Sequence, residues 1–97
     1  MEEVINVHSW LLKPCSDGIS IDVRPPDRFQ IDLLSLKNQQ IDDFILKIVS
    51  SSIVILYTEK NNIKITLYQS GRMLIETREM DTAENIVQSL LKSLKLV

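Results

Sequence analysis

Few residues in this sequence have the types and spacing that catalysis would need. His8 is the single histidine and Cys15 the single cysteine of 97 residues, so the sequence contains no His/Cys cluster with zinc-ligand spacing and no disulfide pair. A nucleophilic Cys15 would need a neighbouring base to form its thiolate, but it follows a proline and precedes a turn without an adjacent basic pair. We therefore expect an inert thiol and a partly buried, structural histidine.

The acidic residues do not form a catalytic pair either. Glu2 with Glu3 and Asp42 with Asp43 are consecutive, and consecutive side chains diverge by about 100° on a helix. Gly71 is a lone turn glycine rather than part of a phosphate-binding loop. The sequence therefore predicts a protein that is not an enzyme and that has no cofactor and no metal.

Composition narrows the remaining functions. Hydrophobic residues make up 44% of the chain and charged residues 25%, which is typical of one globular domain, here residues 1–97. Eleven basic against thirteen acidic residues give a net charge of -2, which disfavours nucleic acid as a partner, although a local basic patch would be compatible with it. The acidic N-terminus, the lone cysteine and the lack of a long apolar run predict a cytoplasmic protein without a membrane span.

Three segments have apolar residues at helical spacing. The first is Glu2–Lys13, which Pro14 would end. The second begins at an Asn38 cap and carries its apolar face on Ile41, Phe44, Ile45 and Ile48. The third begins at an Asp81 cap, with Glu84 three residues later, and has a continuous apolar stripe to Leu94.

Five segments alternate or have strand-like composition. Ile19–Arg24 and Phe29–Leu33 alternate apolar and polar residues, with two prolines between them. Ile53–Glu59, Ile63–Gln69 and Arg72–Thr77 follow one another through short turns rich in asparagine and glycine. Such short connections require antiparallel neighbours, so the last three segments predict a meander.

The element order α-β-β-α-β-β-β-α predicts an α+β fold. We expect a two-layer sandwich in which helices cover one face of an antiparallel sheet of about five strands. The opposite face of the sheet would then be open to solvent or to a partner.

The stretch Leu67–Ile75, which reads LYQSGRMLI, resembles the hairpin of one repeat of the TATA-box-binding protein family and of small archaeal proteins with that fold. The resemblance covers roughly the last forty residues and continues into the helix that begins at Asp81. It implies a TBP-like fold and, if two copies formed a saddle, binding in the DNA minor groove, with Tyr68 as a wedging aromatic. The sequence departs from that pattern at Ser51, Tyr57 and Glu76, and it contains only one repeat.

Alternation along the last strands predicts which residues occupy the open face. Ile63, Ile65 and Leu67 would face the helices, so the residues between them would face outward. The expected interface consists of Val54, Leu56, Lys64, Thr66, Tyr68, Leu74, Glu76 and Arg78. An apolar centre with a rim of mixed charge is typical of protein–protein interfaces. The alternative is that the N-terminal helix or loops cover these side chains.

The sequence thus favours a non-enzymatic interaction module that forms a homodimer or binds a protein partner through its open sheet face. The second hypothesis is a nucleic-acid-associated protein that acts as a dimeric TBP-like saddle. An enzymatic alternative would require a pocket lined by His8 and a carboxylate.

Overall fold

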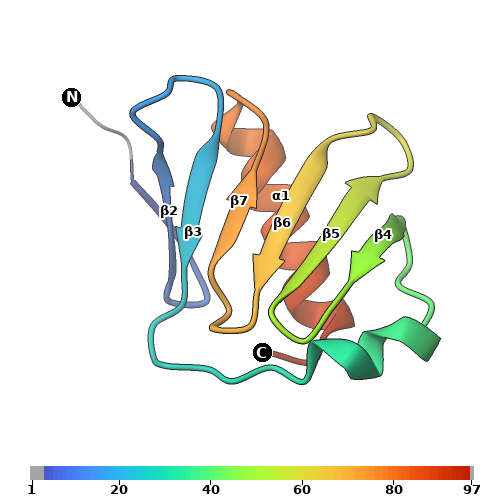
Figure 1. Cartoon of the computed structure of the whole chain (residues 1–97). Coiled ribbons are helices and arrows are strands. Elements are labelled where there is room, and N and C mark those ends of the chain that lie inside the picture. The colour runs from blue at the N-terminus through green and yellow to red at the C-terminus, as the bar shows by residue number, and fades with distance from the viewer. Residues whose placement is uncertain (1–3, 97) are drawn as a thin grey trace.

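The computed structural model describes residues 4–96 and consists mainly of strands (Figure 1). The strands are β1 (Ile5–Val7), β2 (Trp10–Pro14), β3 (Ile21–Arg24), β4 (Phe44–Val49), β5 (Ile53–Thr58), β6 (Lys64–Tyr68) and β7 (Met73–Ile75). A short 3-10 helix, η1 (Leu33–Asn38), lies between β3 and β4, and the α-helix α1 (Met80–Ser93) follows β7.

All seven strands belong to one antiparallel sheet with the order β1-β2-β3-β7-β6-β5-β4. The pairing of β3 with β7 joins the N-terminal strands to the C-terminal meander. The predicted α+β sandwich with about five strands and helices on one face is therefore wrong. Residues 4–96 form a sheet-dominated domain with a single α-helix.

The meander and the final helix are confirmed. β5, β6 and β7 pair in sequence order, and α1 packs its apolar stripe across one side of the sheet (Figure 1). The helix begins two residues earlier than predicted, with Glu79 rather than Asp81 at the N-cap. It ends in a Schellman motif, in which Lys95 has a positive φ of 58° and the Leu96 amide donates to the Leu91 carbonyl at 2.9 Å.

The predicted N-terminal helix is wrong, since its described part forms the β1–β2 hairpin. His8 and Ser9 have φ values of 50° and 70°, and they connect the paired residues Val7 and Trp10. Two successive residues with positive φ make a turn that reverses a strand but cannot continue a helix. Glu2 and Glu3 lie outside the described residues.

Two further predictions fail between β3 and β4, although the strand predicted at residues 19–24 is confirmed as β3. The predicted strand Phe29–Leu33 is an irregular segment that leads into η1. The helix predicted from Asn38 is instead β4, whose run of β-branched and aromatic residues suits a sheet. Ser50 makes the tight turn to β5, with its amide donating to the Ile53 carbonyl at 3.0 Å.

The hydrophobic core lies on the side of the sheet that α1 covers. Alternate strand residues point into it, including Leu12, Val23, Ile65 and Ile75, all fully buried. The segment between β3 and β4 adds two buried leucines and one buried isoleucine, namely Leu33, Leu36 and Ile41. Among residues 4–96, no helix has the length and apolar character to cross a bilayer.

Val54 and Leu56 also belong to this core, at 0% exposure each, so their predicted placement on the outer face is wrong. Their strand partners Leu67 and Ile65 are equally buried, which fixes the inward side of β5. The outward residues of this strand are the intervening ones, and the open face described below contains those instead.

We expect Leu56→Ala to lower the free energy of unfolding by about 2–5 kcal/mol, because it leaves a cavity under α1. The matched change Ile48→Ala, on the exposed side of β4, should cost less than about 1 kcal/mol. Urea denaturation followed by circular dichroism measures both. Equal losses in the two variants would contradict the assigned sides of β4 and β5.

Candidate functional site

The candidate site is the sheet face opposite α1, here called the open face, which no described helix covers (Figure 1). Strand registers place its residues in rows across the sheet. One row consists of Ile48, Ile55, Thr66, Leu74, Asp22 and Lys13, from β4 to β2. The row is apolar at the β4–β5 end and charged at the β2–β3 end, so the open face has two halves of different chemistry.

The apolar half consists of Ile45, Ile48, Ile53, Ile55 and Tyr57, on β4 and β5. Ile45 is 41% exposed and Ile48 54% exposed, which is high for isoleucines in a sheet. A shallow hollow of about 500 Å³ lies among Ile48, Ile55 and Tyr57, with Lys47 and Lys64 at its rim. The apolar half therefore offers aliphatic and aromatic surface bordered by positive charge.

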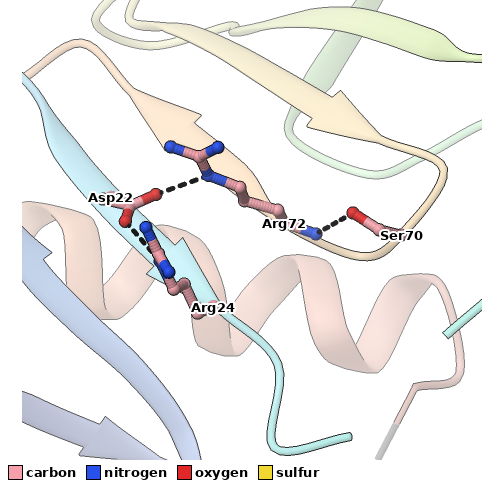
Figure 2. A network of polar contacts seen from close by, with 4 residues as sticks. All are labelled: Asp22, Arg24, Ser70 and Arg72. Carbon is pink, nitrogen blue, oxygen red and sulfur yellow. Dashed lines mark hydrogen bonds and ion pairs between the residues drawn. The ribbon is translucent and has the colours of Figure 1, made fainter. Parts of the chain in front are cut away.

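The cationic half is organised by Asp22 on β3. Its side chain is only 11% exposed and accepts hydrogen bonds from Arg24 Nε at 2.8 Å and from Arg72 Nε at 2.9 Å. In Figure 2 the Asp22 carboxylate lies between the two arginine side chains, and Arg72 comes from the turn before β7. We define the cationic half as Lys13, Asp22, Arg24 and Arg72.

These contacts shift the pKa values of the group. Burial of the Asp22 carboxyl acts to raise its pKa, but the hydrogen bonds and charges of Arg24 and Arg72 outweigh burial and hold it below the ordinary 3.8. The hydrogen bond to Asp22 in turn raises the pKa of Arg72. The Asp22 carboxylate is therefore ionised at neutral pH, and it fixes the positions of two guanidinium groups.

The turn that carries Arg72 packs against the aromatic side chains of Trp10 and Phe29. Gly71 has a φ of +94°, and a Cβ there would lie 3.2 Å from the Trp10 ring, so this position requires glycine. Trp10 stacks on Phe29 with ring centroids 5.4 Å apart. On the open face the Arg72 guanidinium carbon lies 5.9 Å from the Tyr68 ring centroid, within cation–π range.

Five of the eight predicted interface residues lie on the open face, namely Lys64, Thr66, Tyr68, Leu74 and Glu76. Lys64 and Glu76 form an ion pair at 3.7 Å. Val54 and Leu56 are in the core, and Arg78 lies beyond the end of β7, exposed in the connection to α1.

None of the residues of the apolar half or of the cationic half belongs to the interface predicted from the sequence. Ile45 and Ile48 were assigned to a helix face, although the apolar and β-branched residues around them, interrupted only by Lys47, are a strand signal. Ile55 and Tyr57 were left out of the predicted face because Val54 and Leu56, which are in the core, were assigned to the outward side of β5. The grouping of Asp22 with Arg72 has no local signal, because the two residues are 50 positions apart.

The residues considered for catalysis do not meet. His8 is exposed in the β1–β2 turn, and it is not among the residues that line the hollows of the apolar half or of the cationic half. Burial, together with the charges of Asp17 and Asp22, raises the pKa of Cys15, which disfavours its thiolate. Within the described residues, no three His, Cys, Asp or Glu side chains are grouped so that they could hold a metal ion.

Comparison with protein-family models, with curated proteins and with solved structures found no match. The resemblance of the Leu67–Ile75 hairpin to the TATA-box-binding protein family thus stays a prediction.

The low pKa of Asp22 leads to a pH-dependent contribution to stability. A carboxyl whose pKa is depressed on folding stabilises the fold above its unfolded value near 3.8, and this stabilisation is lost as the pH falls through the lower folded value. We expect Asp22→Asn to cost about 1–3 kcal/mol at pH 7, with the difference from the wild type shrinking below pH 3.8. Urea denaturation at pH 7, 4 and 2.5 measures this.

Asp42→Asn is the matched control. Asp42 is exposed, and it makes no side-chain hydrogen bond or ion pair within the described part of the chain. Its substitution should change stability by less than about 0.5 kcal/mol at any of the three pH values. A loss in Asp22→Asn that is the same at pH 2.5 as at pH 7 would contradict the electrostatic assignment.

Proposed function

We propose that this chain is a non-enzymatic, cytoplasmic interaction module that binds protein through the apolar half of its open face. The observation that carries the proposal is the exposure of Ile45 and Ile48 beside Ile55 and Tyr57, on a face that no described helix covers. Contiguous exposed aliphatic and aromatic surface of this kind marks interaction sites, because its burial against a partner removes apolar area from water.

A second copy of the chain is the partner that this geometry favours. A two-fold axis over the apolar half would place Ile48 and Tyr57 of one copy against the same residues of the other, as an isologous interface requires. The cationic half would then lie at the outer ends of the dimer. No arginine would need to lose its water, which is the main cost of burying charge.

Face-to-face packing is favoured over pairing between sheet edges. β4 is one edge of the sheet, and its register with β5 shifts between Leu46 and Ile48. Such a bulge interrupts the row of free backbone groups that another strand would need, and Lys47 adds an exposed charge at the same place. The opposite edge, β1, is only three residues long.

Self-association is measurable by sedimentation velocity of the full chain from about 1 to 200 µM, where a weak dimer dissociates on dilution. We expect Ile48→Asp to weaken the dimer at least about thirtyfold, because the substitution places an unpaired carboxylate at the centre of the interface. Leu74→Asp, farther from the apolar half, should weaken it less.

Gln88→Glu is the control, since it adds the same negative charge at an exposed position of α1 on the other side of the molecule. Its dimerisation should equal that of the wild type. A wild type that remains monomeric over the whole range excludes the second copy as the partner. An equal effect of Gln88→Glu and Ile48→Asp would place the interface elsewhere.

The nucleic-acid saddle is the second candidate, and one observation favours it. The described open face carries five basic side chains against two acidic ones, although the whole chain is acidic. These basic residues are Lys13, Arg24, Lys47, Lys64 and Arg72. Two of the cations, however, share the Asp22 carboxylate, and Lys64 is paired with Glu76, which reduces the charge available to phosphates.

Under the protein-binding proposal, we expect no retardation of duplex or single-stranded DNA by the chain at about 50 mM salt. Retardation that falls steeply with added salt, and that weakens on Lys64→Glu or Tyr68→Ala, would instead establish the nucleic-acid function. Electrophoretic mobility shift or fluorescence anisotropy with a labelled oligonucleotide separates the two outcomes.

A further inference from the structure

A second hollow of about 530 Å³ lies on the open face, beside the cationic half and away from the apolar half. Its lining includes all four residues of the cationic half together with the aliphatic side chains of Val4 and Leu11, and Leu11 is the strand partner of Arg24. The hollow thus combines fixed guanidinium groups with exposed aliphatic side chains, on β2, β3 and the turn before β7.

The two arginines use only a small part of their hydrogen-bonding capacity. Arg24 and Arg72 each bond to Asp22 through Nε, and their side chains remain 65% and 49% exposed. Within residues 4–96, the terminal nitrogens of both guanidinium groups make no hydrogen bond to another side chain. Figure 2 shows Arg24, on the same strand as Asp22, and Arg72, from the turn before β7, both reaching the Asp22 carboxylate, so a single buried group orients the two arginines.

Oriented guanidinium ends of this kind recognise oxyanions. Each end offers two parallel N–H groups, which match the spacing of oxygens on a carboxylate or a phosphate. One guanidinium end satisfies both oxygens of a carboxylate, whereas contacts from two guanidinium groups suit the three terminal oxygens of a phosphate monoester. Because Asp22 already holds the arginines in place, an incoming anion would not have to order both side chains by itself.

We propose that this hollow binds the phosphate group of a phosphate monoester, with Arg24 and Arg72 holding the oxygens through their terminal nitrogens. Val4 and Leu11, 51% and 44% exposed, would contact the organic part of the ester. The site is independent of the proposed protein interface, because it uses other strands and none of the apolar half.

The test is a titration of the full-length chain with phenyl phosphate and with inorganic phosphate, followed by backbone amide shifts in NMR at pH 7.5 and constant ionic strength. We expect saturable shifts at Asp22–Arg24 and in the 70–72 turn, with phenyl phosphate binding more tightly than inorganic phosphate and sodium acetate more weakly than either. Arg24→Gln should weaken phosphate binding about tenfold or more.

Arg72→Lys is the second variant, since it retains the charge but lacks the planar fork, and it should also weaken binding about tenfold. Lys64→Gln, on the same face but outside the hollow, is the control and should bind phosphate like the wild type. Ile48→Asp should also leave phosphate binding unchanged, which separates this site from the protein interface.

Three results would overturn the proposal. They are shifts that rise linearly without saturation, binding by Arg72→Lys equal to that of the wild type, and an equal loss in the Lys64→Gln control. Each would indicate general attraction of anions to a basic surface, rather than a site built by the two arginines.

Discussion

Burial of one side of the sheet under α1 is the interaction on which the rest of the structure depends. Strand alternation sends every second residue into this core, where Leu56, Ile65 and Ile75 lose all contact with water. The same alternation sends the remaining residues to the opposite side, where the described chain supplies no second layer. The open face is therefore a direct consequence of the architecture of residues 4–96, a seven-stranded sheet with a single α-helix, since one helix covers only one side.

The sequence predicted those elements whose signals are local. Short polar turns predict the meander, and one of them contains Gly71, whose positive φ and contact with Trp10 require glycine. A long apolar stripe predicts α1. The β1–β2 hairpin could not be predicted in the same way, because His8 and Ser9 adopt positive φ without being glycine or asparagine. Val4, Val7 and Leu11 also fit helical spacing, and only the tertiary sheet pairing decides against a helix.

The side assignment of β5 shows why the candidate site was only partly predictable. Residues 53–57 are all apolar, so periodicity carries no information about which of them face the core. The β5–β6 turn sets the register of these two strands. In this turn Asn62 has a positive φ of 54°, and the Thr58 hydroxyl accepts a hydrogen bond from the Ile63 amide at 2.9 Å. A slip of one residue exchanges the two faces, so this turn determines that Leu56 is core and Tyr57 is open surface.

Asp22 connects stability with the chemistry of the open face. It lies on β3 beside β7, where the N-terminal strands join the meander, and its bond to Arg72 crosses that junction. A buried carboxylate without partners would be costly, so the two arginines are needed there for folding. The carboxylate occupies only the Nε atoms of Arg24 and Arg72, and both arginine side chains stay largely exposed. Within residues 4–96, the terminal nitrogens of the two guanidinium groups therefore have no side-chain partner. One guanidinium can bond to Asp22 through Nε and still offer its terminal nitrogens to an anion, so the stabilising contact and the proposed phosphate binding are compatible.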